Sequence, residues 1–268
     1  MSRSIDPSEG RALFGLNPEA YDAVRPDYPA WVYERLRDSG ALVDGAATLE
    51  IGAGSGLATR RLLEYGADPL IVIEPDERFT SLLASILERS TADCRLIQES
   101  FEDAPLDRGA FDLVAAATAF HWVEQGAGLT KISNLLRPGR YIALWWNVFQ
   151  VLDRQDAFHE ATHSLLAQLA SSPSGAAQGV PFALDRMERE TALDRAGFRD
   201  IQYAESRWTL TLGSAQVGAL YEGFSSIQRL PERERQRLLD TLMRISDERF
   251  DGRVERHMTT CLYLARTP

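Results

Sequence analysis

The sequence predicts an α/β fold in which helices cover both faces of a mostly parallel β-sheet. The first observation is a unit of strand, glycine turn, helix and second strand that runs from Thr48 to Glu74. The second is the segment 111–119, whose residues are almost all apolar, as in a central strand of a parallel sheet. The third is the order of the elements, because predicted strands alternate with predicted helices up to residue 146.

The turn after the first strand carries the clearest functional signal. The strand, residues 47–51, ends at the loop 52–56 (GAGSG), and a helix is predicted over 57–67. Glycine adopts positive φ without strain and has no Cβ, so a ligand can lie directly on the backbone. Because the loop leads into a helix N-terminus, we expect free N–H groups to face an anion or a polar ligand.

The second strand, residues 70–73, ends at Glu74, an acid about 20 positions after the loop. An acidic residue at that place can accept hydrogen bonds from the two hydroxyls of a ribose. The fingerprint of dinucleotide-binding proteins requires a third glycine where this chain has Leu57, so that fingerprint fails. The chain has instead an acid followed by three glycines at alternate positions, namely Glu50, Gly52, Gly54 and Gly56.

Together with the segment EPD at 74–76, this pattern resembles the first two motifs of the class I S-adenosylmethionine-dependent methyltransferases. The resemblance implies S-adenosyl-L-methionine as the cofactor. It implies that the glycines form the cofactor cradle, that Glu50 helps to hold the amino-acid end, and that Glu74 binds the ribose hydroxyls. The cofactor-site residues expected from these two motifs are Glu50, Gly52, Ala53, Gly54, Gly56, Glu74 and Pro75.

A helix over 75–89, a third strand over 94–97 and the loop 98–103 come next. In open α/β sheets ligands bind beyond the carboxyl ends of the strands, so this loop can reach a base that lies over the glycine loop. In the family, the matching segment contacts adenine through a backbone N–H and a side chain, and the matching residues here are Phe101 and Glu102. The alternative is that both are ordinary loop residues.

The fourth strand continues into the segment AFHWV at 119–123, and the whole run FDLVAAATAFHWV resembles methyltransferases similar to trans-aconitate methyltransferase. We expect Thr118, at the end of the strand, in the cofactor site. His121 is the candidate catalytic residue, since an imidazole there could contact the cofactor, orient the acceptor or take a proton from it. A structural histidine is the alternative. Trp122 is expected as a wall of the substrate pocket.

Before the first strand, helices are predicted near 14–21 and over 30–39. Between them the chain contains Tyr21 and a run of Arg25-Pro-x-Tyr-Pro. The family often carries a similar stretch that folds over the cofactor, so the resemblance implies that Tyr21 and Arg25 belong to the cofactor site. An N-terminal packing segment is the alternative.

After the fourth strand, a helix over 126–136 and a turn at 137–139 lead to a fifth strand over 140–146. Trp145 and Trp146 are successive residues of that strand and therefore face opposite sides of the sheet. We expect one of them in the core and Trp146 in the substrate pocket.

Beyond residue 149 the simple alternation ends. The remaining predicted elements are helices over 153–170, 186–196, 214–227 and 231–250, a sixth strand over 198–210 and a last, antiparallel strand over 253–265. Two insertions leave the carboxyl ends of strands five and six, so we expect them to form a helical lid over the acceptor pocket. The resemblance implies a three-layer, Rossmann-like sheet of seven strands with strand seven antiparallel. The expected organisation is an N-terminal segment and cofactor-binding core (1–149), a lid insertion (150–184), continued core (185–210), a second lid insertion (211–252) and the last core strand (253–268).

Composition limits the function classes. The 268 residues are 44% hydrophobic and 25% charged, which is ordinary for a soluble globular protein, and the net charge of −10 argues against a nucleic-acid partner. No apolar run approaches the roughly 20 residues of a membrane span, and the N-terminus has no signal-peptide core. The two cysteines lie in apolar, strand-like contexts typical of reduced thiols. We therefore expect no membrane partner and a cytoplasmic location.

His159 and His163 are four residues apart on one predicted helix, but no third ligand is near in sequence, so no metal site is expected. The expected function is transfer of a sulfonium methyl group to an oxygen, nitrogen or carbon of a small-molecule acceptor, with a carboxylate or hydroxyl favoured. The alternatives are a non-catalytic cofactor-binding protein of the same fold and an NAD(P)-dependent oxidoreductase. The identity of the acceptor and the choice between monomer and homodimer stay open.

Overall fold

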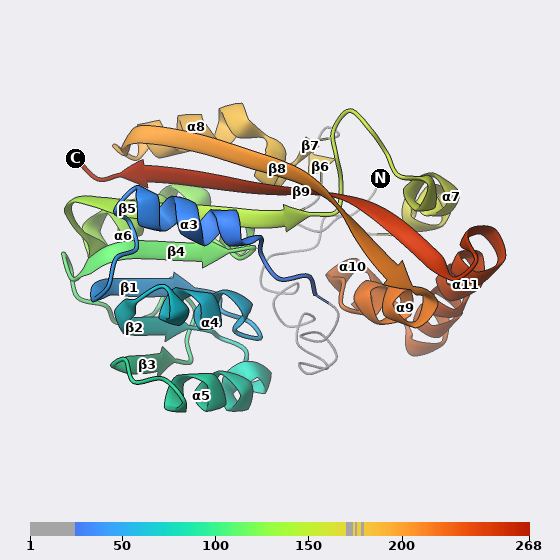
Figure 1. Ribbon diagram of the computed structural model, residues 1–268, viewed down its shortest axis with the longest axis horizontal. Coiled ribbons are helices and arrows are strands. Elements are labelled where there is room, and N and C mark those ends of the chain that lie inside the picture. Colours follow the sequence, from blue (N-terminus) through green and yellow to red (C-terminus); the bar gives the residue numbers. More distant parts are fainter. Residues whose placement is uncertain (1–24, 170–173, 175, 178–179) are drawn as a thin grey trace. The chain divides into compact units, whose positions relative to one another are not determined.

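The computed structural model describes residues 25–169, 174, 176–177 and 180–268. Its main feature is a seven-stranded β-sheet with the strand order β3-β2-β1-β4-β5-β9-β8. The pairs among β1 to β5 are parallel, and β9 runs in the opposite direction to its neighbours (Figure 1). The seven strands are β1 (Ala46–Ile51), β2 (Ala67–Ile73), β3 (Cys94–Ile97), β4 (Phe111–Ala117), β5 (Leu136–Val148), β8 (Arg199–Gly213) and β9 (Arg253–Arg266). The expected seven-stranded α/β fold with an antiparallel last strand is confirmed.

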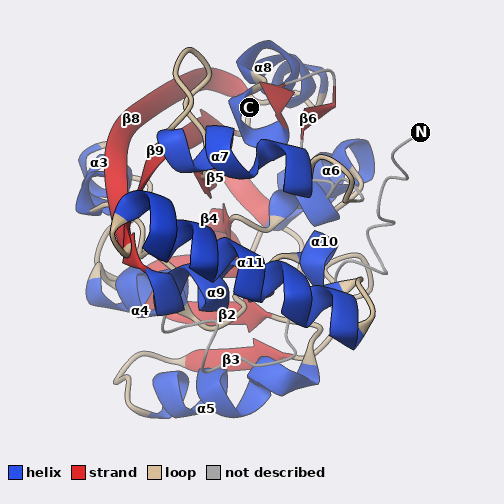
Figure 2. Ribbon diagram, turned by 90° about the vertical axis from the view of Figure 1, so that its right-hand side faces the viewer, coloured by secondary structure: helices blue, strands red, loops and turns tan. Residues whose placement is uncertain are grey.

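Helices cover both sides of the parallel strands. Helices α3 (Ala30–Asp38) and α4 (Leu57–Glu64) lie on one side, and α6 (Gln125–Leu135) and α8 (Arg186–Arg195) lie on the other (Figure 2). Every residue of β1 is buried between these layers. This burial explains why the strand consists of small and apolar residues apart from one acid, Glu50.

The chain divides into two compact units. The core unit contains residues 27–146, 183–205 and 260–268, and so holds β1 to β4 with the helices packed on them. The helical unit contains residues 147–182 and 206–259, together with Arg25 and Pro26. Strands β5, β8 and β9 contribute residues to both units.

The helical unit has a hydrophobic core of its own. Its helices are α7 (Ala157–Leu166), α9 (Ser214–Glu222), α10 (Ser225–Gln228) and α11 (Glu232–Phe250). The apolar residues of α9 and α11 recur at helical spacing and face one another across this core. The buried side chains are Phe158, Leu212, Val217, Leu220, Tyr221, Ile227, Leu239, Leu242 and Val254. The two sequence segments that supply them therefore form one body.

The segment after β2 differs from the sequence expectation. Instead of one helix over 75–89, a short 3-10 turn, η1 (Glu77–Phe79), precedes α5 (Thr80–Glu88). The Asp76 side chain accepts the Arg78 N–H at 3.0 Å and so caps the turn rather than a helix that begins at residue 75. The other short elements are η2 (Phe120–Trp122), η3 (Phe182–Leu184), β6 (Ala176–Ala177) and β7 (Val180–Pro181).

Other boundaries also differ from the sequence expectation. The helix predicted over 57–67 ends at Glu64, because Ala67 already belongs to β2, and the helix predicted over 214–227 is divided into α9 and α10. Residues 137–139, where a turn was expected, lie inside β5. The strand continues through Gly139, which has a φ of +72°, and its pairing with β4 is irregular there. The helix expected over 153–170 is the shorter α7, which begins after its capping residue Asp156.

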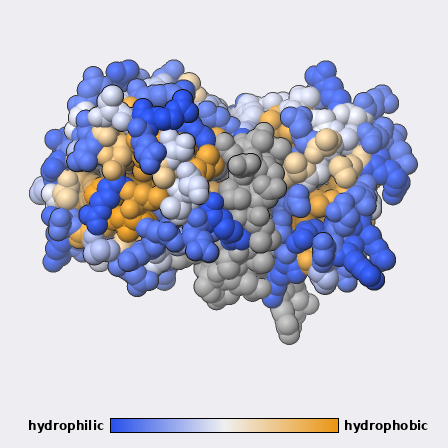
Figure 3. Space-filling view, turned by 90° about the horizontal axis from the view of Figure 1, so that it is seen from below, coloured by the Kyte–Doolittle hydropathy of each residue, from blue (hydrophilic) through white to orange (hydrophobic). Residues whose placement is uncertain are grey.

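The surface is mainly polar on the face drawn in Figure 3, where hydrophobic side chains form separate patches. Large exposed hydrophobic residues of the described chain are scattered in sequence, at Val43, Leu152, Leu165, Val180 and Met187. None of the described helices has both the length and the apolar character needed to cross a membrane.

A buried ion pair joins separate parts of the helical unit. The side chains of Arg256 on β9 and Asp156 before α7 are 3% and 4% exposed, and Nε of Arg256 lies 2.9 Å from the Asp156 carboxylate. The same carboxylate accepts the main-chain N–H groups of His159 and His257 at 2.6 and 3.0 Å. Arg256 also donates to the Tyr221 hydroxyl. Burial by itself raises the pKa of Asp156, but the Arg256 charge and these hydrogen bonds bring it below its usual value.

We predict that Asp156→Asn lowers the free energy of unfolding by about 3 kcal/mol, because it leaves the buried Arg256 guanidinium without an opposite charge. Urea unfolding followed by circular dichroism measures this change. The matched control is Asp153→Asn, which removes a 3.0 Å ion pair with Arg207 between exposed side chains and is expected to leave stability unchanged. Equal effects of the two substitutions would contradict the role given to the buried pair.

Candidate functional site

Four loops lie at the carboxyl edge of the parallel strands. They follow β1, β2, β3 and β4 and contain residues 52–56, 74–76, 98–104 and 118–123. Because these strands are adjacent and parallel, their carboxyl ends lie at the same edge of the sheet, where ligands bind in open α/β folds. Most of the residues predicted for the cofactor site are on these loops.

The N–H groups of the glycine loop are used inside the protein. Gly52 and Ala53 donate to the carbonyl of the last residue of β2 at 2.8 and 3.2 Å, and Gly56 donates to Ala53 at 2.9 Å. Gly54 donates to Oε2 of Glu74 at 2.7 Å. The expectation that the loop offers free N–H groups is therefore wrong for these four residues. What the loop offers a ligand is close approach to its backbone.

Two glycines show why this approach is possible. Gly52 and Gly54 have φ values of +67° and +55°, which favour glycine. A Cβ on Gly52 would lie 2.7 Å from the Cβ of Ala119, so the loop after β4 leaves no room for a side chain there. A Cβ on Gly54 would meet no atom within 4 Å. The loop is thus closed on the side of Gly52 and open at Gly54.

Glu74 holds a defined position beside the loop. Its side chain is 8% exposed, Oε2 accepts the Gly54 N–H, and Oε1 accepts the Asp76 N–H at 3.0 Å. These two bonds orient the carboxylate beside the glycine loop.

Glu50 is a buried carboxylate with one unsatisfied oxygen. Its side chain is 1% exposed, Oε2 accepts the Thr59 hydroxyl at 2.6 Å, and Oε1 has no hydrogen-bond partner among the described residues. Burial raises the pKa of Glu50 to about 7, with the Thr59 hydrogen bond acting against this rise and the Glu74 charge adding to it. A buried acceptor without a donor is costly. Oε1 therefore marks a place where a ligand can supply an ammonium or N–H group.

The loop after β3 turns back on itself. Ser100 Oγ donates to Asp103 at 2.7 Å, and the N–H groups of Asp103 and Ala104 donate to the Ser100 carbonyl at 3.2 and 2.9 Å. The Phe101 side chain is 3% exposed, whereas Glu102 is exposed. A ligand at this loop can therefore contact the main chain of both residues and the side chain of Glu102.

Thr118 has a strained backbone at the end of β4. Its φ is +52°, which β-branched residues rarely adopt. Its N–H donates to the Trp145 carbonyl at 2.7 Å, and its hydroxyl accepts a hydrogen bond from Tyr28 at 2.9 Å. Such strain persists where the surroundings hold it, and it is concentrated at binding sites. Tyr28 was not predicted as a site residue, although it lies in the same Arg-Pro-x-Tyr-Pro run as Arg25.

The His121 ring is held in one tautomer. The residue is 7% exposed, and Nε1 of Trp146 donates to Nδ1 of His121 at 3.1 Å. Because an indole nitrogen is a donor only, Nδ1 carries no proton, and the neutral imidazole carries its proton on Nε2. The basic lone pair of the ring is thus engaged, and His121 is suited to donate a hydrogen bond. The Trp122 ring lies 4.9 Å from the His121 ring.

Trp145 and Trp146 are both core residues, 0% and 2% exposed. Trp145 packs edge-on against Tyr28, and Trp146 packs edge-on against Tyr263 of β9, with ring centroids 6.0 and 6.2 Å apart. The different neighbours fit successive strand residues that face opposite sides. Trp146 contacts the site through His121, and its place in a substrate pocket stays a prediction.

Two predicted residues do not belong to the described core unit. Arg25 is part of the helical unit, where its guanidinium lies over the rings of Phe149 and Phe224 at 5.7 and 5.0 Å from their centroids. Tyr21 lies outside the described residues, as does the helix expected near 14–21. The roles of both residues toward a cofactor stay predictions.

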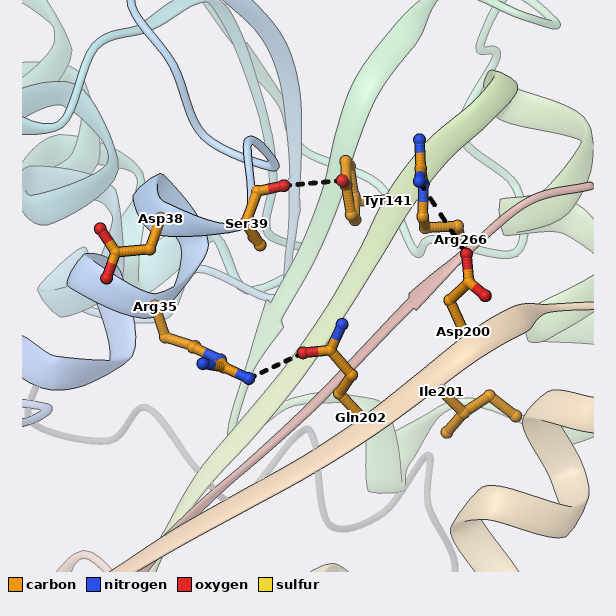
Figure 4. A pocket seen from close by; sticks show the side chains of 8 residues that line it. All are labelled: Arg35, Asp38, Ser39, Tyr141, Asp200, Ile201, Gln202 and Arg266. Atoms are coloured by element: carbon orange, nitrogen blue, oxygen red, sulfur yellow. Dashed lines mark hydrogen bonds and ion pairs between the residues drawn. The ribbon is translucent and has the colours of Figure 1, made fainter.

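A cavity of about 480 Å³ lies in the core unit away from these loops (Figure 4). Asp200 at the start of β8 and Arg266 at the end of β9 place it at the opposite edge of the sheet, and they form an ion pair of 3.9 Å. Arg35 donates to Gln202 at 2.8 Å across it. In the described part of the chain, this cavity included, no group of three or more His, Cys, Asp or Glu side chains could hold a metal ion.

Comparisons with known proteins find similarity to methyltransferases. Residues 49–144 match the model of a methyltransferase domain family. The chain is 27% identical over 219 residues to an uncharacterised methyltransferase of Schizosaccharomyces pombe, covering 81% of this chain and 80% of that one. It is 26% identical over 244 residues to the malonyl-acyl-carrier-protein O-methyltransferase of Geobacter sulfurreducens, covering 87% of each.

A solved structure also has this fold. It is that of phosphoethanolamine N-methyltransferase 2 of Haemonchus contortus in complex with phosphomonomethylethanolamine and S-adenosylhomocysteine. The TM-score is 0.58 at 13% identity, and the match covers 97% of this chain and 60% of that one. At this identity the likeness shows the fold alone.

We predict that Glu50→Gln stabilises the ligand-free protein at pH 8 by roughly 3 kcal/mol, because it removes a buried charge. The folded protein keeps the Glu50 proton up to about pH 7, whereas the unfolded chain loses it near the usual value of 4.5. The contribution of Glu50 to stability is therefore fully present below pH 4.5, the pKa in the unfolded chain, and it is lost as the pH rises to about 7, the pKa in the folded protein. The difference in unfolding free energy between Glu50→Gln and the wild type should therefore shrink as the pH falls from 8 to 5.

Urea unfolding at a series of pH values measures this difference. Glu77→Gln is the control, because Glu77 is an exposed acid at the start of η1, three residues after Glu74. A Glu50→Gln protein that is less stable at pH 8, or whose stability differs from wild type equally at all pH values, would contradict the account of Glu50.

Proposed function

We propose that this chain is a class I S-adenosylmethionine-dependent methyltransferase that methylates an oxygen atom of a small-molecule acceptor, with a carboxylate favoured over a hydroxyl. The match of residues 49–144 to a methyltransferase domain family and the fold support the class. The observation that carries the proposal is a pair of buried carboxylates, Glu50 and Glu74, on either side of a glycine loop. One of them is held by the loop itself, and the other has an oxygen that lacks a donor.

The residues of the site fit S-adenosylmethionine, which carries an ammonium group, a ribose with two adjacent hydroxyls and an adenine base. Oε1 of Glu50 lacks the donor that an ammonium group provides. Glu74 presents an oriented carboxylate of the kind that accepts ribose hydroxyls. The open space at Gly54 allows the cofactor to lie on the backbone. We assign Phe101 and Glu102 to the base, with Thr118, Ala53 and Pro75 as further contacts.

The chemistry needs little from acid or base groups of the chain. When bound, the cofactor supplies a methyl group on a positively charged sulfur, already activated for transfer. The residues of this chain have to align the acceptor with that methyl group and exclude water, which can account for a large share of the rate. Two buried aromatic side chains beside the site, Trp146 and Phe120, give it an apolar surrounding.

The tautomer of His121 favours a carboxylate acceptor. A carboxylate is already a nucleophile and needs no base, whereas a hydroxyl has to lose a proton. Nδ1 of His121 already accepts the Trp146 N–H, so the ring is better suited to donate from Nε2 to an anionic acceptor. The malonyl-acyl-carrier-protein O-methyltransferase is named for an acceptor group that ends in a carboxylate, and it supports the same class.

We further propose that residues 150–184 and 211–252 act as a lid over the acceptor, with Tyr21 and Arg25 closing over the cofactor. The support is that both segments share one hydrophobic core and can move as one body. Hydrogen exchange with and without S-adenosylhomocysteine measures this closure. Protection should rise in α7, α9 and α11 when the ligand binds, and unchanged exchange in all three would contradict the lid.

We predict that Glu74→Ala weakens binding of S-adenosylhomocysteine by about 100-fold, since it removes hydrogen bonds to a charged group. Isothermal titration calorimetry measures the affinity. Glu77→Ala, which removes an exposed acid three residues further on, should bind as wild type does. Unchanged affinity of Glu74→Ala would show that the ribose assignment is wrong.

We predict that His121→Ala lowers kcat/KM for a carboxylate acceptor by about 10- to 100-fold, the value of one hydrogen bond to a charged group. His121→Gln keeps an N–H donor and should recover most of this loss. The measurement is transfer of labelled methyl groups into a panel of small acids and alcohols. A Gln variant as inactive as Ala, together with a preference for alcohols, would show that His121 is a general base.

A further inference from the structure

Lys131 is the only lysine of the sequence, and its side chain reaches the loop after β3 from helix α6. Its ammonium group donates to the main-chain carbonyls of Phe101, Glu102 and Ala104 at 2.7, 3.1 and 3.0 Å. It also lies 5.0 Å from the centroid of the Phe101 ring. The Lys131 side chain thus binds most of the main-chain carbonyl groups of the turn at 100–104.

These bonds determine how the turn presents its N–H groups. The peptide between Phe101 and Glu102 is trans, so its C=O and N–H point in opposite directions. Because Lys131 holds the Phe101 carbonyl, the Glu102 N–H points away from Lys131. The next peptide is held in the same way through the Glu102 carbonyl, and its N–H, that of Asp103, donates to the Ser100 carbonyl at 3.2 Å.

We propose that Lys131 is a positioning residue that selects adenine, by fixing the direction of the Glu102 N–H toward the base of the cofactor. The inference rests on the proposed function, in which the turn at Phe101 and Glu102 contacts that base. Lys131 itself does not contact the ligand. Its hydrogen bond to the Phe101 carbonyl fixes the orientation of the peptide plane between Phe101 and Glu102. That orientation determines which edge of the base the loop can bind.

A lysine suits this task better than the arginine that this chain uses everywhere else. An ammonium group is a compact point charge whose three donors point along separate directions, and so it can bind three carbonyls that converge on one point. A guanidinium is a planar fork that fits two parallel acceptors. Lys131→Arg keeps the charge but not this geometry.

The test compares binding of S-adenosylhomocysteine with binding of its hypoxanthine analogue, S-inosylhomocysteine, by calorimetry. N1 of adenine accepts a hydrogen bond, whereas N1 of hypoxanthine carries a hydrogen. Wild-type protein should therefore prefer the adenine ligand by about tenfold or more, the value of one matched hydrogen bond. Lys131→Met should lose most of this preference by weakening only the adenine complex, and Lys131→Arg should keep part of it.

Arg89→Met is the matched control, because it removes one exposed cation from the end of α5 in the same unit and should keep the full preference. The melting temperature of each ligand-free protein shows whether the variants fold. A folded Lys131 variant with wild-type preference, or one that binds both ligands equally more weakly, would overturn the inference. If wild-type protein bound neither ligand, the proposed function itself would fail, and this inference with it.

Discussion

The hydrogen bond from the Gly54 N–H to the Glu74 carboxylate is the interaction on which the site depends. It joins the loop after β1 to the first residue after β2, and the other oxygen of Glu74 accepts the Asp76 N–H. The loop cannot change conformation without releasing the carboxylate, and the carboxylate cannot turn without leaving main-chain donors unpaired. The two halves of the proposed cofactor site therefore hold each other in place before a ligand binds.

Glu50 shows the opposite condition. It is as deeply buried as the core residues around it, yet one of its oxygens has no partner in the described chain. The cost of this unsatisfied oxygen supports the proposed role of Glu50, in which a ligand supplies the missing donor. The site thus combines a carboxylate that the fold satisfies with one that the fold leaves for the ligand.

The parts of the fold that follow from local sequence could be predicted. β3 has the predicted bounds, and β1 and β4 differ from their predicted ranges by one or two residues, because buried parallel strands are short apolar segments bounded by polar loops. The spacing of Glu50, the glycines and Glu74 also identified the cofactor class. These features depend only on residues that are close in sequence.

Contacts between distant segments could not be predicted. Tyr28 donates to Thr118 across 90 residues, and Lys131 reaches carbonyls 27 to 30 residues before it. Lys131 binds main-chain atoms, which every residue has, so no pattern of side chains indicates its partner. The same holds for the glycine loop, whose N–H groups were expected to be free because the sequence does not show that the end of β2 accepts them.

The central claim is that the glycine loop and its two carboxylates bind an adenosyl cofactor that carries an amino acid. Calorimetric titration of the purified protein with S-adenosylhomocysteine, and in parallel with NADPH, tests it most directly. The account predicts saturable binding of S-adenosylhomocysteine with one site per chain and no detectable heat from NADPH. Tight binding of NADPH without binding of S-adenosylhomocysteine would contradict it.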